Sequence, residues 1–420
     1  MSATAWENAK AWAKATSSIQ RLGLREIPFT ESPIDLNSDT LSRVFTGRRD
    51  ELRRVFNLFQ SRERRRILVY GRLGIGKSTF LLEVLSVLRR KRPKMLTTYI
   101  SLPADLDLAT TALIAVAQEM PENDWAQRQL YQMGIPTAKP IKERSSEAGG
   151  SMVLTGKISE KDVPITKPQY PAISLDILLE QAQKQHPDGV AIAIDDLDKQ
   201  SPRYVRQLMH DAQGVLKGRA WFMLTGHPFG MTGDLLTSER GLFDLQLPLE
   251  EMDQATTYEM LINYLSSARL NHDCTDPDDP AAVLPFLPDA ARHFCEVSKG
   301  KPRLFNRLGA QVLAKAAALQ VDEITLAVLN RGLSAASRNL VQQAALKVQE
   351  KRVLALLQAR SHLSDEAIAL EDLEGLGVTT YSELLPILER LETADLAYRL
   401  AEDDATAFAP MPLPPAAEEE

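Results

Sequence analysis

The stretch Ile67–Phe80, ILVYGRLGIGKSTF, joins a short apolar run to a glycine-rich turn and the start of a helical pattern. Its centre, from Gly71 to Ser78, matches the G-x-x-x-x-G-K-[ST] pattern of a phosphate-binding loop at every required position. Glycine backbones adopt conformations closed to other residues, so successive N–H groups can point at phosphate oxygens. We expect this role for Gly71, Gly74 and Gly76.

The pattern also predicts roles for the residues that begin the helix. Lys77 would reach the β- and γ-phosphates of a nucleotide, and the positive end of the helix dipole would lie behind it. Ser78 would offer its hydroxyl to Mg²⁺, and Thr79 would line the same site. The alternative is a plain glycine turn between a strand and a helix. The complete set of strand, loop, Lys and Ser favours the phosphate loop.

A second motif lies in Gly189–Lys199, GVAIAIDDLDK, where a continuous apolar strand ends in acids. This hhhhDD pattern is the Walker B motif. Asp195 would hold Mg²⁺, directly or through water, and Asp196 would orient the attacking water. Asp198 lies beyond the motif and is a candidate helix cap. A buried strand with a polar end is the alternative.

The composition is that of a globular protein with two or three domains: 420 residues, 44% hydrophobic and 25% charged. Cys274 and Cys295 are too few for a disulfide framework or a zinc site, so we expect packing roles and a reducing compartment. No apolar run reaches the roughly 18 residues that cross a bilayer, and the first residues lack the apolar core of a secretory signal. We therefore expect a cytoplasmic protein with no membrane contact.

Charge is distributed unevenly along the chain. Residues 43–94 hold 16 Lys or Arg against 4 Asp or Glu, whereas residues 351–420 hold 5 against 15. The two regions should favour different partners. The run Arg89–Arg92 has a simpler explanation, because cations complement the negative end of a helix.

The segment Phe45–Leu52, FTGRRDEL, precedes the phosphate loop by about twenty residues. With the two motifs above, it resembles the ATPase module of AAA+ ATPases of the origin-recognition initiator type and of the signal-transduction STAND ATPases. The resemblance covers about residues 27–335. It implies an α/β P-loop NTPase core with a parallel five-stranded sheet sandwiched by helices, followed by a helical lid. It also implies that Arg48 lies at an adenine pocket.

The resemblance assigns three further residues. Thr225, at the end of the apolar run 220–226, matches the sensor 1 position, although a turn-forming threonine is an equal rival. Arg240 precedes the last strand of the core and is the candidate trans-acting arginine finger, unless it is a plain surface arginine. Arg303, in GKPRL, matches the sensor 2 arginine of the lid, the alternative being a solvated helix start. Asp196 replaces the usual Glu, which implies slow hydrolysis.

The last segment has the order and size of a winged helix, with helices over 341–360, 369–374 and 379–392 and strands over 396–400 and 406–409. Origin initiators use such a domain on DNA. Here the helix beginning at Thr379 has no Lys or Arg before Arg390, and the expected wing holds Glu402, Asp403 and Asp404. Phosphate contacts need cations, so we expect this domain to contact a protein instead.

We therefore predict an N-terminal helix and extended segment (1–43), an ATPase core (44–249) with an insertion at 120–172, a helical lid (250–338), a winged helix (339–410) and a disordered tail (411–420). The chain would bind ATP and Mg²⁺ and work as a slow ATPase switch. It would form homo-oligomers and act on double-stranded DNA through its basic ATPase region. The alternative is a STAND-like sensor whose winged helix contacts a protein effector.

Overall fold

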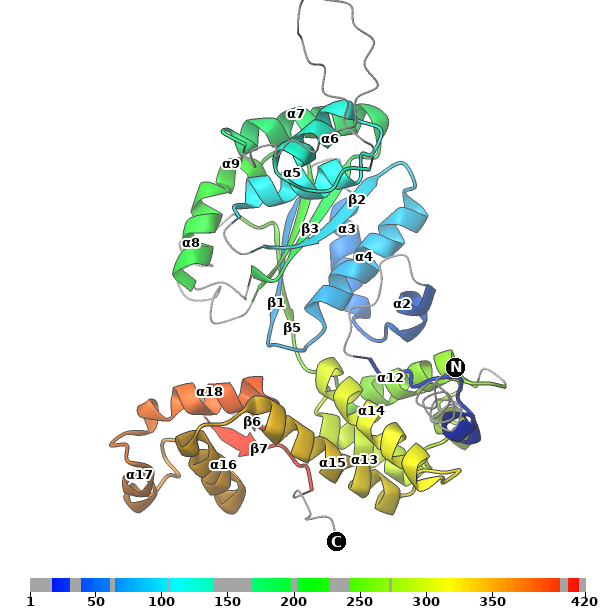
Figure 1. Ribbon diagram of the computed structural model, residues 1–420, viewed down its shortest axis with the longest axis vertical. Coiled ribbons are helices and arrows are strands. Elements are labelled where there is room, and N and C mark those ends of the chain that lie inside the picture. Colours follow the sequence, from blue (N-terminus) through cyan, green and yellow to red (C-terminus); the bar gives the residue numbers. More distant parts are fainter. Residues whose placement is uncertain are drawn as a thin grey trace, which may run out of the picture.

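The computed structural model describes residues 17–30, 39–60, 65–103, 106–138, 168–197, 202–226, 242–271, 274–400 and 407–414. The chain forms three parts (Figure 1). The core that contains the sheet lies on one side, and a helical lid and a C-terminal domain lie together on the other. No helix in the described part of the chain combines the length and apolar character that crossing a membrane requires.

The core is a five-stranded parallel sheet with the order β2-β3-β4-β1-β5. Its strands are β1 (Arg66–Gly71), β2 (Leu96–Ser101), β3 (Val190–Asp195), β4 (Trp221–Gly226) and β5 (Leu245–Leu249). The central strands β3 and β4 are buried along their whole length, as the continuous apolar runs predicted. The predicted P-loop NTPase fold class is confirmed.

Side chains alternate across the sheet and build two separate cores. Ile192 and Ile194 of β3 face the helices α5 to α8, whereas Ala191 and Ala193 face α3 and α4. The helices on the first face are α5 (Leu108–Gln118), α6 (Asp124–Gln132), α7 (Pro171–Gln185), α8 (Pro202–Asp211) and α9 (Gln213–Leu216). Those on the second are α3 (Arg49–Phe59) and α4 (Lys77–Lys91), and α2 (Asp39–Val44) lies against α4 (Figure 1).

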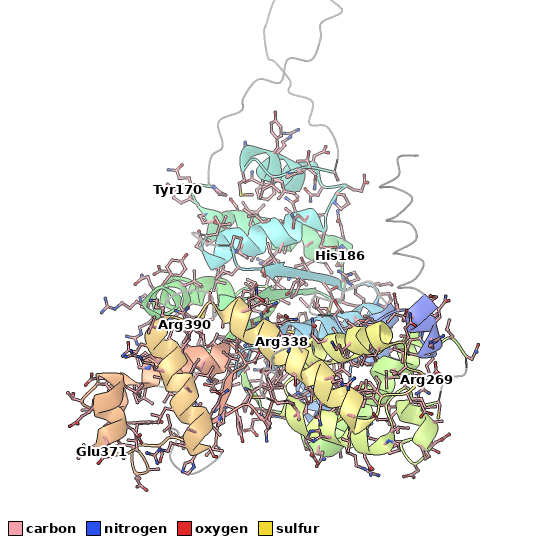
Figure 2. The ribbon with its side chains drawn as sticks, turned by 60° about the horizontal axis from the view of Figure 1, so that its bottom comes forward. Tyr170, His186, Arg269, Arg338, Glu371 and Arg390 are labelled. Carbon is pink, nitrogen blue, oxygen red and sulfur yellow. The ribbon has the colours of Figure 1, made fainter. Side chains whose placement is uncertain are left out.

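The lid comprises α12 (Gln254–Ala268), the 3₁₀ turn η2 (Pro280–Val283), α13 (Pro288–Ser298), α14 (Pro302–Leu319) and α15 (Leu326–Ala344). The C-terminal domain follows, with α16 (Val348–Arg360), α17 (Leu370–Leu376), η3 (Tyr381–Glu383), α18 (Leu385–Thr393), β6 (Ala397–Arg399) and β7 (Phe408–Pro410). β6 and β7 pair antiparallel. Figure 2 shows this domain from below, with Glu371 on its outer side and Arg390 nearer the core.

One cluster of buried apolar side chains runs through both the lid and the C-terminal domain, from Leu22 to Met411. The two cores on the faces of the sheet are separate from it. Burying a shared apolar surface holds the lid and the C-terminal domain together as one unit. The predicted boundary at 338 falls within α15, which continues to Ala344.

The insertion predicted at 120–172 needs correction at both ends. Residues 124–132 form α6, and α7 begins at Pro171. Both belong to the core: buried Gln127 of α6 donates to the carbonyls of Ala117 (3.1 Å) and Met120 (3.2 Å), and Leu175 and Leu178 of α7 pack in the apolar cluster on that face of the sheet. Residues 139–167 of the predicted insertion lie outside the described residues, as do residues 1–16 of the N-terminal segment and the acidic residues 402–404 of the expected wing.

Gly300 links the core to the lid through a close backbone contact. Met252 donates its N–H to the carbonyl of Gly300 (3.0 Å), and a Cβ at Gly300 would lie 1.9 Å from the Met252 oxygen. Gly300 has a left-handed φ of +64°, and Gly377 has a similar φ of +72° with no atom within 4 Å of an added Cβ. Substitution by alanine therefore adds a steric clash at one site and only backbone strain at the other.

We expect Gly377→Ala to lower the free energy of unfolding by about 1–2 kcal/mol, the cost of a left-handed non-glycine residue. Gly300→Ala should lower the free energy of unfolding by about 1–3 kcal/mol more than Gly377→Ala does, because the chain must move to accept the methyl group. Urea unfolding of the two variants followed by circular dichroism measures the difference. Equal losses would contradict the close approach at Met252.

Candidate functional site

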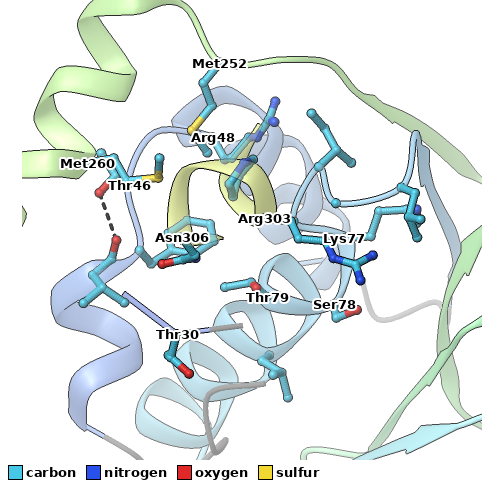
Figure 3. A pocket seen from close by; sticks show the side chains of 18 of the residues that line it. Thr30, Thr46, Arg48, Lys77, Ser78, Thr79, Met252, Met260, Arg303 and Asn306 are labelled. Atoms are coloured by element: carbon cyan, nitrogen blue, oxygen red, sulfur yellow. Dashed lines mark hydrogen bonds between the residues drawn. The ribbon is translucent and has the colours of Figure 1, made fainter. Parts of the chain in front are cut away.

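A cavity of about 460 Å³ lies between the loop after β1, the segment 44–48 and the lid (Figure 3). Its walls include most of the residues singled out from the sequence: Arg48, Gly74, Gly76, Lys77, Ser78, Thr79, Asp195, Asp196 and Arg303. Pockets for small molecules usually have volumes of about 300–1,000 Å³. Residues more than two hundred positions apart in the sequence thus share one site.

The loop after β1 has the conformation that its glycines allow. Gly74 and Gly76 have φ values of +78° and +94°, and Gly76 is the N-cap of α4. The buried Lys77 side chain folds back over the loop, where its ammonium donates to the carbonyls of Gly71 (2.8 Å) and Arg72 (3.1 Å). The positive charge and the N-terminus of α4 therefore point into the same end of the cavity, which we call the phosphate end.

Arg303 reaches the phosphate end from the lid. Its backbone N–H donates to the carbonyl of Gly74 (3.1 Å), and a Cβ at Gly74 would lie 2.9 Å from the Cβ of Arg303. Pro302 also lies over Gly76. The start of α14 thus rests directly on the loop, and only glycine leaves room for it at position 74.

Asp195 ends β3 and is 2% exposed. Its Oδ1 accepts from the Thr225 hydroxyl and from the Asp196 N–H (2.9 Å), and its Oδ2 accepts from the Tyr99 hydroxyl (2.6 Å). Asp196 has a left-handed φ of 66°, and its Oδ2 accepts from the Ser101 hydroxyl. These bonds hold both carboxylates at the phosphate end of the cavity.

Tyr99 stands between Asp195 and Ser78. Burial, together with the negative charge and the hydrogen bond of Asp195, raises the pKa of Tyr99 far above its ordinary value, although a hydrogen bond to Ser78 acts in the opposite direction. The hydroxyl therefore stays protonated and remains a donor over the whole physiological pH range. Tyr99 fixes the orientation of the Asp195 carboxylate.

Thr225 lies at the end of β4, beside Asp195 and Asp196 at the end of β3, and its sensor role stays a prediction. It is fully buried and does not line the cavity. Its hydroxyl donates to Asp195 and accepts from the Asp196 N–H (3.1 Å). Because β4 lies between β1 and β3, the end of β4 faces the carboxylates and its hydroxyl is used there.

Arg48 lines the cavity, as expected, at the left-handed N-cap of α3. Its guanidinium donates to the Glu250 carbonyl and to Glu51 (3.2 Å), which ties segment 44–48 to the end of β5. Gly71 belongs to β1 and accepts from Lys77 without lining the cavity. Arg240 and Asp198 lie outside the described residues, so the arginine finger stays a prediction.

Sequence reasoning missed Tyr99, Ser101, Arg72 and Asn306. Two of them had a detectable signal, because β2 pairs in register with β3 and places Ser101 opposite Asp195 and Tyr99 opposite Ala193. Polar residues at the end of a strand next to the Walker B strand are therefore candidates for supporting it. Arg72 and Asn306 depend on the placement of the lid and the C-terminal domain, which no local pattern gives.

Comparison with known proteins agrees with this architecture. The AAA ATPase domain family matches residues 44–214. The structure of the Aeropyrum pernix ORC2 protein in ADPNP-ADP complexes is similar, with a TM-score of 0.52 at 14% identity over 92% of this chain and 94% of that one. The Aeropyrum pernix ORC1 protein in complex with DNA gives 0.51 at 13% identity over 90% and 92%. No curated protein sequence matches the chain. Residues 44–214 are thus similar to the AAA ATPase domain family, and the chain has the P-loop NTPase fold that it shares with these two ORC proteins.

Proposed function

We propose that this chain binds ATP with Mg²⁺ in the cavity and works as a nucleotide-dependent switch with slow hydrolysis. The observation that carries the proposal is the ion pair between Arg72 of the phosphate loop and Glu392 of the C-terminal domain, whose nitrogen and oxygen lie 3.3 Å apart. It connects the nucleotide site to a domain that starts more than 270 residues later. Lys77 and Arg303 would bind the phosphates from opposite sides.

The oxygen donors at the phosphate end fit a magnesium ion that arrives with a nucleotide. Among the described residues, no group of three His, Cys, Asp or Glu could hold an ion by itself. Mg²⁺ bound with a nucleotide typically takes one or two protein oxygens besides phosphate oxygens and water, and the Ser78 hydroxyl and Asp195 carboxylate are such donors. Asp196 would orient the attacking water, and its short side chain favours slow turnover.

Removing the Tyr99 hydroxyl tests the metal role of Asp195. Tyr99→Phe leaves Asp195 Oδ2 without its 2.6 Å donor, so the carboxylate is held less firmly. Loss of a hydrogen bond that orients a metal ligand typically weakens metal affinity by about 10- to 100-fold. We expect a shift of this size in the Mg²⁺ concentration that supports ATP binding, measured by isothermal titration calorimetry. ATP binding in EDTA should change little.

Tyr204→Phe is the matched control, because the Tyr204 hydroxyl donates to the Leu106 carbonyl (3.0 Å) and Tyr204 does not line the cavity. If both variants show the same Mg²⁺ dependence as the unmodified protein, Asp195 does not hold the ion.

The contact between the phosphate loop and the C-terminal domain is electrostatic. The Arg72 guanidinium pairs with Glu392 at 3.3 Å and with Glu251 at 3.4 Å, and Thr393 lines the cavity. A triphosphate bound within a few ångströms would compete with Glu392 for Arg72 and repel the carboxylate, because charges within a Debye length of about 8 Å are poorly screened. We propose that ATP weakens this ion pair.

The C-terminal domain is tied much more firmly to the lid. Arg307 of α14 pairs with the buried Asp395 (3.2 Å), and Lys299 lies over the Tyr398 ring (4.8 Å from its centre). Because the two parts also share one apolar cluster, they would move together when the Arg72–Glu392 pair breaks. The nucleotide state would then set the orientation of this whole unit relative to the core.

Energy transfer between dyes on α3 and α17 measures that movement. We place cysteines at the exposed Asn57 and Glu371 in a Cys274→Ser background. The unmodified protein should give different transfer efficiencies with ADP and with a non-hydrolysable ATP analogue. Glu392→Gln should give the ATP value with either nucleotide, because the ion pair is lost. A partly exposed pair contributes about 0.2–1 kcal/mol, so the shift in populations is up to about fivefold.

Glu389→Gln is the control, because Glu389 and Glu392 both pair with Arg399, at 2.9 and 3.1 Å, but only Glu392 also pairs with Arg72. It should respond to nucleotide as the unmodified protein does, and Lys77→Ala should not respond. If Glu392→Gln and Glu389→Gln behave alike, the switch does not run through Arg72.

We further propose double-stranded DNA as the partner of the basic ATPase region. The ends of α3 and α4 lie together, because Arg92 donates to the Phe59 carbonyl, and their exposed cations include Arg54, Lys91 and Lys94. The structure of the similar ORC1 protein is a complex with DNA, which supports this assignment. Homo-oligomers, in which Arg240 would reach a neighbouring ATP site, are part of the same proposal.

The alternative is a STAND-like sensor whose winged helix contacts a protein effector, and the charge of segment 379–393, predicted as one helix over 379–392 but folded as η3 and α18, favours it. The Thr379 and Thr380 hydroxyls donate to Glu383 (2.6 and 3.1 Å), and these bonds lower the pKa of Glu383. Arg390, the cation of α18, pairs with Glu350 (3.2 Å). Segment 379–393 would therefore present the ionised carboxylate of Glu383 to any partner, and this charge repels DNA phosphates.

A gel-shift titration separates the two functions. The DNA proposal expects ATP-dependent binding of a duplex that weakens steeply between 50 and about 200 mM salt, as counterion release requires. The double variant Arg54→Glu with Lys94→Glu should weaken it about tenfold or more, whereas Lys184→Glu on α7 should not. Absence of any shift at low salt would remove the DNA proposal and leave the protein effector.

A further inference from the structure

The cavity has a second end, away from the phosphate loop, between segment 44–48 and the lid helices α12 and α14. Six residues that line it are Val44, Thr46, Met252, Met260, Tyr264 and Asn306. Apolar and aromatic walls with a few placed polar groups are typical of sites for flat heteroaromatic ligands. The two polar side chains among these six that bear an amide or an aliphatic hydroxyl are Thr46 and Asn306.

The hydroxyl of Thr46 is already engaged on both sides. It donates to the Val44 carbonyl (3.0 Å) and accepts from the side-chain amide of Asn263 (2.9 Å). Thr46 is also 4% exposed. Thr46 therefore holds segment 44–48 against α12, and its hydroxyl has little hydrogen-bonding capacity left for a ligand.

Asn306 is different, because half of its amide is unsatisfied. It is 8% exposed, and its Nδ2 donates to the Tyr264 hydroxyl (3.3 Å). Its Oδ1 is buried and has no hydrogen-bond partner among the residues that the structure describes. Figure 3 shows this side chain inside the pocket, between Thr46 and Thr79. A buried acceptor without a donor is costly, so it indicates a site for a donor on a ligand.

Tyr264 fixes which atom of the amide remains available. Its ring stacks on Phe29 with 5.7 Å between centres and packs edge-on against Phe305 at 5.6 Å. Burial raises the pKa of Tyr264, so its hydroxyl stays protonated and keeps its place beside Asn306. With Nδ2 directed at this hydroxyl, Oδ1 is the atom left for the cavity.

We infer that Asn306 determines base specificity by accepting a hydrogen bond from the 6-amino group of adenine. The inference rests on the proposal that the cavity binds a nucleoside triphosphate, and it adds the reason for choosing ATP. Hypoxanthine and guanine carry a carbonyl oxygen at position 6. That oxygen would face Oδ1 acceptor to acceptor, so both groups would remain unpaired in a buried site. Asn306 thus selects adenine against 6-oxopurines.

Binding of ATP and ITP to the full chain, each with Mg²⁺, tests this assignment. Hypoxanthine, the base of ITP, has a carbonyl oxygen at position 6 where adenine has an amino group, and it carries a proton on N1. An unmade hydrogen bond to a buried group typically costs about 10- to 100-fold in affinity, and the unmodified protein should prefer ATP by this factor. Asn306→Leu should weaken ATP binding while leaving ITP binding nearly unchanged, so that the ATP-to-ITP ratio falls close to one. Calorimetry or competition against a fluorescent nucleotide measures both constants.

Tyr264→Phe provides a second variant that removes a single oxygen. It frees the amide to rotate, so the ATP-to-ITP ratio should fall to an intermediate value. Asn330→Leu, at an exposed position on α15, is the control and should keep the unmodified ratio. Retained ITP binding by Asn306→Leu shows that the variant is folded.

Three results would overturn the inference: no preference for ATP in the unmodified protein, a preference for ITP, which means that Nδ2 faces the base, or an unchanged ratio in Asn306→Leu. Failure of the unmodified protein to bind either nucleotide would overturn the proposed function itself. The two failures are therefore distinguishable.

Discussion

The parallel pairing of β1, β4 and β3 is the constraint on which the site depends. β4 pairs with β1 from Phe222 to Gly226 and with β3 from Trp221 to Leu224. All three strands therefore end at the same edge of the sheet, where ligands of open α/β sheets bind. The loop with Lys77 follows β1, and Asp195 ends β3. Between these strands, the Thr225 hydroxyl at the end of β4 donates to Asp195 and accepts from the Asp196 N–H. The order of the strands therefore determines which side chains meet at the site.

The local patterns predicted much of this edge. The phosphate loop, the Walker B strand and the lid helix with Arg303 each have a signature within about ten residues, and the cavity is lined by residues from all three. What the sequence could not give was the partner of each polar group. Thr225 has the expected location but bonds to Asp195 and Asp196, because only the strand order reveals what lies beside it. Asn306 had no signal, since its neighbour Tyr264 comes from another helix 42 residues earlier.

The charge count of the sequence also did not reveal the partner of each charged side chain. The sequence places 16 cations against 4 acids in residues 43–94, yet the fold brings acids from elsewhere to them. Arg66 pairs with Asp244 at 3.0 Å and Arg49 with Glu259 at 3.1 Å, while the Arg89 guanidinium donates to Thr97. Part of the basic region therefore builds the core and its contact with the lid. Among the described residues, the exposed cations include Arg54 of α3 with Lys91 and Lys94 at and just beyond the end of α4, and the ends of these two helices are joined by the hydrogen bond from Arg92 to the Phe59 carbonyl.

Arg72 shows how a residue that no loop pattern specifies can gain a function from its surroundings. Its position in the phosphate loop is one of those left open by the G-x-x-x-x-G-K-[ST] motif, so the loop itself does not require an arginine there. The guanidinium lies between Glu251, just after β5, and Glu392, at the end of α18. Two carboxylates from different parts of the chain thus share one cation beside a site built for phosphate. A bound triphosphate, as proposed above, would compete for that cation, and Glu392 is the partner whose domain does not belong to the sheet. In the proposed switch, coupling between the nucleotide site and the C-terminal domain would therefore arise from competition for a single positive charge.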